Sequence, residues 1–401
     1  MHLHLAVAKG HDSEMATITN DLDLGSTLYE VVCQYADLGN HRTGSEVDGA
    51  TVRWLEAELA FRGAVVEHIE YNFPRYCVTS EVLIGGHTVE ALPLYYEAVG
   101  NVSTAHPFVA SLNVDVARHP VKGDLTITPD LGRTISAAKA AGSAAALFAT
   151  QGADGRLIVF NRPGRAGSGL PVLLVPGALS EELQREPLQV DVAASNCAGT
   201  SANVLGYFGD AERHNPLVIT TPLTGWFRCA GERGTGIAVA LEVATRLAAD
   251  FPVLFVGTSG HEIGYLGVKD FIRGHRHLRP RGVVFVGASV GSGAPDEDGN
   301  LKLTPRRVIT TASLSGFGPL TPMLESANLS LRQDDDARSW AGEICEWTGY
   351  GVPLLSVRGR SPLFHTPDDL PQQSTSPQLM ELASDSLVEV IRLFAQNGVI
   401  P

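Results

Sequence analysis

From Ala202 to the C-terminus, short apolar runs alternate with helical patterns, and this alternation constrains the fold more than any other feature. Continuous apolar runs over 252–257 and 282–287 predict strands that are buried on both faces. Between them, 236–249 is apolar nearly all round, which predicts a buried helix. Strands that alternate with helices predict an α/β fold, a doubly wound and mostly parallel sheet with helices on both faces.

Three more helices are predicted around this sheet. We expect Ser26 to cap a helix over 26–38 and Ser45 to cap the next one. The last helix is expected to begin with Ser376 as its cap and Pro377 at its first position. In the second helix, apolar residues at three- and four-residue spacing are expected to face the core: Val47, Ala50, Trp54, Ala57 and Phe61. The other strands predicted for the core lie at 65–71, 203–208, 217–221, 308–311 and 353–357.

Residues 75–199 differ from the rest of the chain because they are rich in Ala, Val and Gly and carry few groups suited to catalysis. Their patterns predict a helix over 133–141 and strands over 124–128, 144–148 and 170–175. The helix ends in Ala-Ala-Gly, and Gly-Leu-Pro-Val leads into the last strand. This order resembles the protease-associated domain, which in its families is an insertion that shapes access to an active site.

The chain is therefore expected to have three parts. Residues 1–25 are expected to be irregular, and 26–74 together with 200–401 are expected to form the core. Residues 75–199 are expected to form a smaller, β-rich α/β insertion.

The composition excludes some classes of function. Asp and Glu number 44 against 30 Lys and Arg, a net charge of −14, which argues against sequence-independent binding of nucleic acid. No apolar run approaches the roughly 20 residues of a membrane span, and the N-terminus lacks the features of a signal peptide. The cysteines are odd in number and form no paired motif, so we expect reduced thiols and a cytoplasmic protein: Cys33, Cys77, Cys197, Cys229 and Cys345.

Three loops carry side chains that suit a metal site. Glu232 lies in the Gly-rich turn 230–236, Glu262 follows the strand 252–257, and His365 precedes the last helix. Two carboxylates and one imidazole are an acceptable set of three ligands, which leaves an open position for water. The alternative is that each is an ordinary loop residue in solvent. Spacing alone leaves both readings open.

Several stretches also resemble motifs of the co-catalytic zinc aminopeptidase family, which includes bacterial leucyl aminopeptidases, glutamate carboxypeptidase and glutaminyl cyclase. His-Arg-Thr-Gly-Ser at 41–45 resembles the opening segment of that family. Residues 262–267 resemble its Glu-x-Gly-x-x-Gly motif, and 365–369 resemble its closing His-Thr-x-x-Asp. The resemblance extends from about residue 27 to 396. It implies a zinc peptidase-like fold around an inserted protease-associated domain.

The resemblance implies an incomplete metal site. The family has two metals joined by a carboxylate, and the ligands of one metal fall at Glu232, Glu262 and His365, which all keep ligand-type side chains. The private ligands of the other metal fall at Pro222 and Ala288, which cannot serve. The implied cofactor is therefore one divalent metal per chain, zinc or another.

His261 stands where the family has its glutamate base. It could be a base, because a histidine can take a proton near neutral pH. It could also be an extra ligand, or a packed residue left after catalysis was lost. Weaker candidates for substrate binding are Trp226, Arg228, Arg233, Glu343 and Trp347.

Two of these weaker candidates have more specific readings. Trp347 is expected to form a wall of the pocket. Arg233 could clamp a carboxylate, could fill the vacated second-metal space, or could be an exposed loop arginine.

These patterns lead to a metal-dependent hydrolase that cleaves an amide-type C–N bond in a small molecule or peptide conjugate. It would use one metal and His261 as the base. The alternative is a non-catalytic or cyclase-type relative that binds a small molecule or peptide between the core and the insertion. No nucleic-acid or membrane partner is expected, and assembly into a homo-oligomer stays open.

Overall fold

The computed structural model describes most of the chain: residues 23–94, 100–113, 129–151, 155–161, 169–210, 215–304 and 307–397. The expectation of an irregular segment over 1–25 falls mostly outside these residues. The described part begins directly before α1 (Leu24–Asp37), so residues 24 and 25 are helical. None of the described helices is long and apolar enough to cross a membrane.

One large sheet organises the core, and its strand order is β15-β14-β16-β11-β9-β10-β8-β1-β2. The four central strands are parallel: β16 (Leu354–Arg358), β11 (Gly282–Val286), β9 (Leu217–Pro222) and β10 (Val253–Thr258). Antiparallel partners flank them, with β14 (Arg307–Thr311) beside β16 and β8 (Leu188–Phe208) beside β10. The predicted α/β fold with a mainly parallel sheet is confirmed.

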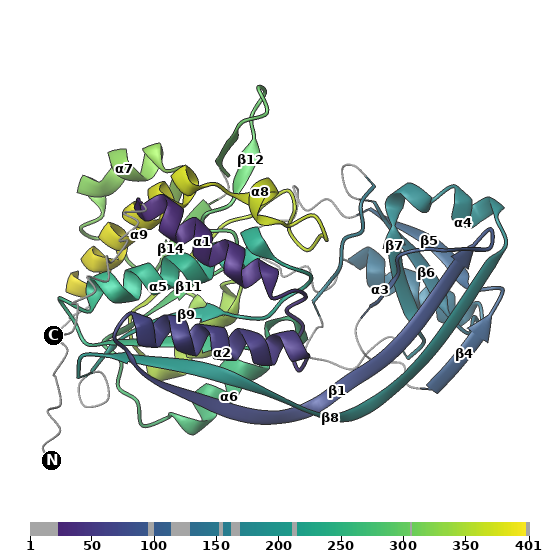
Figure 1. The fold of residues 1–401 in the computed structure, drawn as a ribbon, viewed down its shortest axis with the longest axis horizontal. Helices are drawn as coiled ribbons and strands as arrows, with labels where there is room; N and C mark the ends of the chain where they lie inside the picture. The colour runs from purple at the N-terminus through teal and green to yellow at the C-terminus, as the bar shows by residue number, and fades with distance from the viewer. Residues whose placement is uncertain are drawn as a thin grey trace, which may run out of the picture.

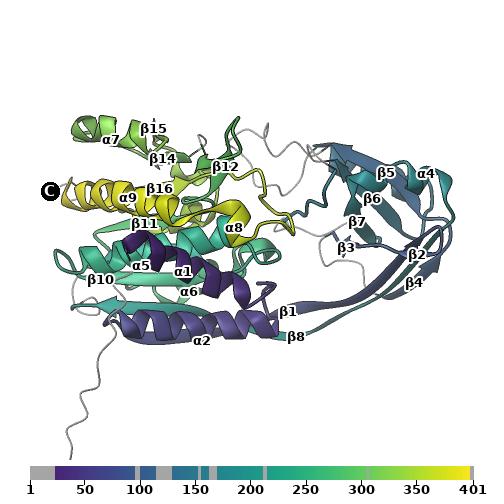
Figure 2. The same cartoon turned by 45° about the horizontal axis from the view of Figure 1, so that its top comes forward.

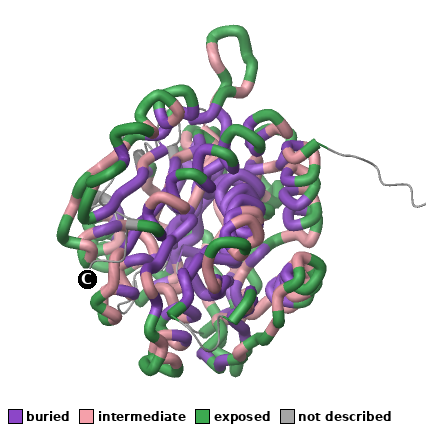
Figure 3. The backbone as a smooth tube through the Cα atoms, turned by 90° about the vertical axis from the view of Figure 1, so that its left-hand side faces the viewer, coloured by how far each residue is buried: buried purple, intermediate pink, exposed green. Residues whose placement is uncertain are grey.

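Helices cover both faces of this sheet (Figures 1 and 2). On one face, α1 packs with α5 (Thr235–Leu247) and α9 (Pro377–Asn397). On the other face lie α6 (Leu266–Gly274) and the 3₁₀ segment η6 (Glu343–Tyr350). Alternate strand residues point to the two layers, as in β10, where Phe255 belongs to the first cluster and Leu254 to the second. Figure 3 shows the buried interior that results.

The predicted N-terminal cap is wrong for the first helix and confirmed for the second. Asp23, not Ser26, caps α1, because its Oδ1 accepts a hydrogen bond of 2.7 Å from the backbone N–H of Ser26. Ser45 caps α2 (Glu46–Phe61) as predicted, and its Oγ accepts from the N–H of Asp48 at 3.1 Å.

The predicted apolar face of α2 is wrong. Phe61 is 86% exposed, whereas the buried residues of the helix are Asp48, Thr51, Val52, Leu55 and Leu59. The polar members find partners inside the protein, since Asp48 accepts from Ser201 and Thr51 pairs with His41. Because its polar residues are hydrogen-bonded, this face of the helix can be buried although the spacing of apolar residues does not predict it.

A long antiparallel ribbon connects the core to the insertion. Its strands are β1 (Val65–Ile84) and β8, which pair along their whole length and curve beneath the core in Figure 1. The predicted strand 65–71 is only the first part of β1. The expected domain boundaries at 74/75 and 199/200 fall opposite each other in the middle of this ribbon, where Pro74 faces Ala198.

The insertion folds around a smaller sheet of order β3-β7-β6-β5. Three of the predicted elements are found here as α3 (Pro129–Ala140), β6 (Ala146–Gln151) and β7 (Val172–Pro176). The predicted strand 124–128 lies outside the described residues. The remaining elements of the insertion are β2 (His87–Thr88), β3 (Leu92–Pro93), β4 (Gly100–Thr104), β5 (Phe108–Asn113), η1 (Gly177–Leu179) and α4 (Glu182–Arg185).

The remaining elements of the core are short, and the hairpin of β12 and β13 stands out from the body of the molecule in Figure 1. The final helix begins at Pro377, and Ser376 Oγ accepts from the N–H of Leu379 at 3.3 Å, so the predicted cap is confirmed. These short elements are η2 (Ala230–Gly234), η3 (His261–Ile263), β12 (Gly293–Pro295), β13 (Leu301–Leu303), η4 (Gly318–Leu320), α7 (Thr321–Ser326), β15 (Leu329–Gln333), η5 (Ala337–Ser339) and α8 (Pro371–Ser374).

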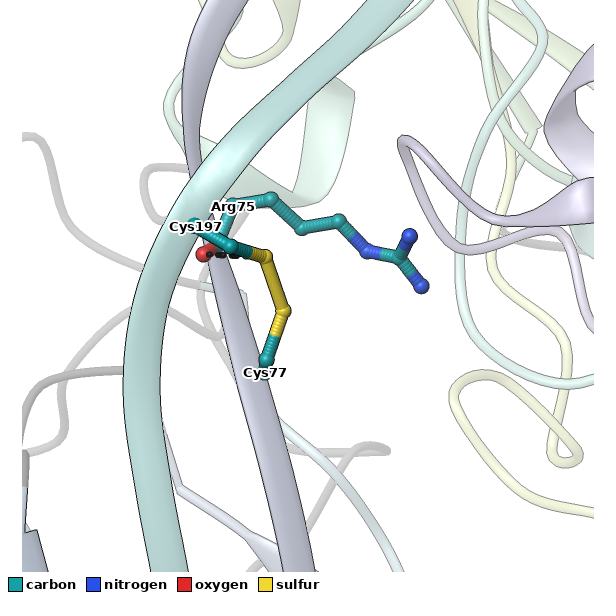
Figure 4. The surroundings of a disulfide bond; sticks show 3 residues. All are labelled: Arg75, Cys77 and Cys197. Atoms are coloured by element: carbon teal, nitrogen blue, oxygen red, sulfur yellow. Dashed lines mark hydrogen bonds between the residues drawn. A yellow bond between two sulfur atoms is a disulfide. The ribbon is translucent and has the colours of Figure 1, made fainter.

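A disulfide joins the two strands of the ribbon (Figure 4). It links Cys77 to Cys197, whose Cα atoms lie 6.5 Å apart. The prediction of five reduced thiols is therefore wrong for these two residues, which the sequence separates by 120 positions. The cytoplasmic location was expected because the thiols were taken as reduced, and that premise does not hold for this pair.

Candidate functional site

The candidate residues come together at the carboxyl ends of β9 and β10, the edge at which α/β sheets bind ligands. Thr258 at the end of β10 lies beside Pro222 at the end of β9. The chain then enters loops that carry Glu232, His261 and Glu262, and the loop after β16 brings His365 to them. All four side chains are buried.

Backbone strain is concentrated around this edge. Six described residues other than glycine have positive φ, and five of them flank the site: Phe227, Cys229, Tyr265, Ser289 and His365. Such conformations cost about 1–3 kcal/mol each and persist only where the surroundings enforce them. These residues therefore cluster at the same sheet edge as the candidate side chains.

Two glycines of the Glu-x-Gly-x-x-Gly stretch are required by the turn after β10. Gly264 has a φ of +89°, a conformation that L-residues rarely adopt. At Gly267 an added Cβ would lie 2.3 Å from the backbone oxygen of Ser259. These two glycines therefore allow the chain to double back and place His261 and Glu262 under the sheet edge.

Glu232 is the centre of a buried ionic cluster. Its Oε1 lies 2.7 Å from Nη2 of Arg233 and 3.2 Å from Nε2 of His365. Burial alone would raise the pKa of Glu232, but the positive charge of Arg233, together with His365, lowers it to about 2. Glu232 is therefore a carboxylate that the neighbouring guanidinium of Arg233 holds in its charged form.

The insertion orients His365. Nδ1 of this histidine lies 3.0 Å from the backbone oxygen of Val159, and the N–H of Val159 donates to the backbone oxygen of His365 at 3.1 Å. Because a carbonyl only accepts, Nδ1 carries the proton in the neutral ring and Nε2 presents its lone pair toward Glu232. A segment of the insertion thus sets the tautomer of a residue in the core.

Asp369 holds the turn that carries Glu232. Its two carboxylate oxygens accept from the N–H groups of Gly231 and Glu232 at 2.8 and 2.9 Å. Burial raises the pKa of Asp369 to about 6, although these hydrogen bonds oppose the shift. The closing motif of the sequence therefore supplies both His365 and Asp369, which positions the turn that carries Glu232.

The carboxylate of Glu262 is hydrogen-bonded by two threonines. Its Oε1 accepts from the N–H and the hydroxyl of Thr43, both at 2.7 Å, and its Oε2 accepts from the hydroxyl of Thr224 at 2.8 Å. Sequence reasoning missed both threonines as partners. The only available hint was their position, since Thr43 lies in the opening motif and Thr224 lies two residues after Pro222.

His261 is paired with Glu343. Its Nδ1 lies 2.8 Å from Oε1 of Glu343, and the other carboxylate oxygen accepts from the hydroxyl of Thr258. Glu343 is fully buried and comes from η6, far away in sequence. Because the carboxylate accepts a hydrogen bond from Nδ1–H, the proton of the neutral ring stays on Nδ1. Nε2 is then the nitrogen that can take up and release a proton.

The residues fit a metal ion only in part. Both oxygens of Glu232 and Nε2 of His365 are buried without a hydrogen-bond partner, and their donor types suit zinc. The carboxylate oxygens of Glu262, by contrast, already accept hydrogen bonds from Thr43 and Thr224. Within the described part of the chain, no group of three or more His, Cys, Asp or Glu side chains is placed to hold a metal. The structure therefore places His365 beside Glu232, and the assignment of Glu232, Glu262 and His365 as ligands of one metal stays a prediction.

The weaker candidates are placed in different surroundings. Arg233 is 2% exposed, so the reading of an exposed loop arginine is wrong. Arg228 is exposed, and its Nη1 lies 3.6 Å from Oδ1 of Asp37. Trp226 is buried, and its ring Nε1–H donates a hydrogen bond of 2.9 Å to Oδ1 of Asn161 in the insertion.

The expectation that Trp347 forms a pocket wall does not match its surroundings. This side chain is fully buried and packs against Phe271 and Tyr350 beneath the sheet. Its ring supports α6 and η6, and with them the segment that carries Glu343.

A cleft of about 550 Å³ opens between the core and the ribbon. Its walls are the loop around Arg42 and Thr43, residues 73–79 of β1, and residues 193–195 of β8. Glu262 and Ile263 complete the lining on the core side. This volume is in the range of ligand pockets for small molecules, about 300–1,000 Å³.

Comparison with known proteins identifies the fold. No family model and no curated protein matches the chain. Solved structures do match, among them BSAP, a zinc aminopeptidase from Bacillus subtilis, with a TM-score of 0.68 and 17% identity over 92% of this chain and 94% of that one. A peptidase M28 precursor from Shewanella amazonensis matches with a TM-score of 0.66 and 16% identity over 94% and 96% of the two chains. The chain therefore has the fold of zinc peptidase-like proteins.

Proposed function

We propose that this protein is a peptidase-like hydrolase that cleaves an amide-type C–N bond of a small molecule or peptide conjugate. The observation that carries the proposal is the buried pair of His261 and Glu343 at the sheet edge, next to the ionic cluster of Glu232. The fold it shares with solved zinc aminopeptidases supports a hydrolytic reaction. The cleft beside Glu262 would admit the substrate.

In the proposed reaction, His261 moves the proton. Glu343 accepts from Nδ1 and so keeps Nε2 as the basic nitrogen. Nε2 takes a proton from a water molecule as the water oxygen forms a bond to the amide carbon. The same proton then passes to the amide nitrogen as the C–N bond breaks, which yields a carboxylic acid and an amine. The carboxylate of Glu343 stabilises the imidazolium that exists between the two steps.

A divalent metal such as zinc would be held by Glu232 and His365, whose buried ligand atoms have no other hydrogen-bond partner. Bound there, the ion would polarise the amide carbonyl and lower the pKa of a nearby water. Glu262 would join them only by giving up its hydrogen bonds to Thr43 and Thr224. Arg233 would have to share Glu232 with the ion.

The proposal is tested with His261→Asn and Glu343→Gln. We expect turnover of amides, measured with added zinc, to fall by about 10²–10⁴-fold in His261→Asn, because the proton carrier is lost. Glu343→Gln should also reduce turnover, since the amide no longer stabilises the imidazolium. His87→Asn is the matched control, because His87 is exposed on β2 of the insertion, and it should behave like wild type. Equal turnover in all four proteins would refute a role for His261.

The second candidate is a protein that binds a small molecule or peptide without cleaving it. The observation that favours it is Arg233, whose guanidinium already neutralises Glu232. Metal content separates the two candidates. A hydrolase of the proposed kind should retain about one equivalent of zinc or a similar metal after purification. Protein that stays free of metal in added zinc, yet still binds ligands, would favour the second candidate.

A further inference from the structure

We propose that Asn161 of the insertion is a positioning residue of the candidate site. It holds the segment 156–161, which we call the strap, against the core, and the strap in turn orients the ring of His365. The inference rests on the proposed function only for the role of His365 as a predicted metal ligand. The position of the ring can be measured without any turnover.

The strap makes two hydrogen bonds with one residue of the core. Nδ1 of His365 lies 3.0 Å from the backbone oxygen of Val159, and the N–H of Val159 donates to the backbone oxygen of His365 at 3.1 Å. His365 also has a φ of +61°, in the left-handed region that residues other than glycine rarely adopt. Such a backbone persists only where its surroundings enforce it, and the strap supplies two of the contacts that do so.

Asn161 attaches the strap to a second loop of the core. Its Oδ1 accepts from Nε1–H of Trp226 at 2.9 Å, and both residues are buried. A buried donor that loses its acceptor keeps the full cost of its desolvation, so this bond is expensive to break. The ion pair of Arg156 with Asp368, at the start of the strap, is partly exposed, and such pairs contribute little. Asn161 therefore holds the strap more strongly than Arg156 does.

The strap and the loops of the candidate site share one hydrophobic cluster. The strap members of this cluster are each at most 2% exposed: Leu157, Ile158, Val159 and Phe160. The loops that carry Glu232, Glu262 and His365 each pack at least one apolar side chain into or against it: Trp226 and Phe227, Ile263, and Phe364. A displacement of the strap would therefore disturb the packing of all three loops.

The strap is also fixed to the sheet of the insertion. The N–H of Ile158 donates to Oγ1 of Thr150 at 3.0 Å, and this hydroxyl donates to the backbone oxygen of Val175 at 3.3 Å. Thr150 lies in β6 and Val175 in β7. Hydrogen bonds thus connect β7 through Thr150 to the strap, and the strap to His365. The sheet of the insertion therefore helps to define where the ring of His365 lies.

The position of this ring matters because its Nε2 lies 3.2 Å from Oε1 of Glu232. While Nδ1–H is bonded to the backbone oxygen of Val159, Nε2 stays directed toward that carboxylate. A group that orients a histidine ligand through its other ring nitrogen typically contributes about 10–100-fold to metal affinity or activity. Release of the strap would free the ring and remove that contribution.

The first measurement follows the ring Nδ1–H of His365 by NMR of protein that contains isotope-labelled histidine, with His365→Gln to assign the signal. In wild type we expect this proton to exchange slowly with water, because it is buried and hydrogen-bonded. Asn161→Leu leaves Trp226 without its acceptor, so exchange should be about 10–100-fold faster. The amides of β10 should exchange as in wild type, which separates a local release of the strap from a general loss of stability.

Asn161→Leu/Trp226→Phe is the rescue variant, because it removes both polar partners and leaves neither of them buried and unsatisfied. Its His365 ring proton should exchange more slowly than that of Asn161→Leu alone. Asn196→Leu is the matched control, because Asn196 is exposed on β8, and it should behave like wild type. In added zinc, Asn161→Leu should turn over amides about 10–100-fold more slowly than wild type.

Wild type tests the contact by itself: a ring Nδ1–H that exchanges as fast as that of an exposed histidine overturns the proposal. So does exchange in Asn161→Leu that equals wild type, or that is faster in β10 by the same factor. The two proposals fail separately. A protected ring proton that depends on Asn161, in a protein that cleaves no amide, would remove only the hydrolase function. Amide turnover that Asn161→Leu leaves unchanged would remove only the positioning role.

Discussion

The carboxylate of Glu232 is fully buried, and its Oε1 lies 2.7 Å from Nη2 of Arg233. Two buried charges of opposite sign depend on each other, because the loss of one leaves the other without compensation in a medium of low dielectric. The sequence showed that a carboxylate and an arginine are neighbours here. It did not show that both are inside the protein, because a Gly-rich loop usually lies at the surface.

Arg233→Met should reduce the free energy of unfolding by about 3–5 kcal/mol, because Glu232 is left buried and unpaired. The double variant Glu232→Gln/Arg233→Met should recover most of the loss, since it removes both charges. The measurement is urea unfolding of the wild type and three variants as a double-mutant cycle. Arg246→Met is the control, because its ion pairs are partly exposed and should contribute less than about 1 kcal/mol each. A loss of the same small size in Arg233→Met would contradict the buried ion pair.

Asp48 should give the molecule a distinct dependence on pH. Burial raises its pKa from 3.8 to about 6, although hydrogen bonds from Ser201 and Gly44 oppose the shift. A carboxyl whose pKa is raised in the folded state stabilises that state below its unfolded pKa, and the contribution is lost as the pH rises through about 6. Wild type should therefore gain stability relative to Asp48→Asn as the pH falls from about 6 to 4, by up to about 3 kcal/mol. A difference that does not change over this range would show that Asp48 titrates normally.

At the scale of elements, strands such as β10 and β11 could be predicted from their continuous apolar runs. A strand that is buried on both faces needs apolar residues at nearly every position. The buried face of α2 could not, because Asp48 and Thr51 are buried through hydrogen bonds with distant residues. The ribbon could not be predicted either. Only the start of β1 alternates clearly, and the rest is held by pairing with β8, more than a hundred residues away. The site loops were found from motifs, but the contacts of Glu262 and His261 were not. Thr224 was not a candidate, and Glu343 was a candidate for substrate binding and not the partner of His261.

The ribbon leads to a prediction of its own. Cys77→Ser/Cys197→Ser removes the covalent link between β1 and β8, and we expect it to reduce the free energy of unfolding by about 2–4 kcal/mol. The same loss should appear in wild type when a reductant is added. Cys345→Ser is the control, because this cysteine is free and should not change the effect of the reductant. Wild type that unfolds identically with and without reductant would contradict a disulfide in the folded protein.

For the whole molecule, residues of the insertion contact residues of the core around the candidate site. Val159 of the insertion orients His365, Asn161 accepts from Trp226, and the ribbon between the two parts forms a wall of the cleft. A fold of this kind explains why catalytic groups could be proposed from the core alone while the substrate class could not. The lining of the cleft comes from β1, β8 and loops of the core that only the folded molecule brings together.

The most direct measurement of the central claim is turnover of amides that bind to wild type, compared between wild type and His261→Asn in added zinc. The account predicts that wild type releases the amine from at least one bound amide and that His261→Asn does so about 10²–10⁴-fold more slowly while it binds the same ligand. Ligands that bind to wild type but are never cleaved, or that both proteins cleave at the same rate, would contradict it.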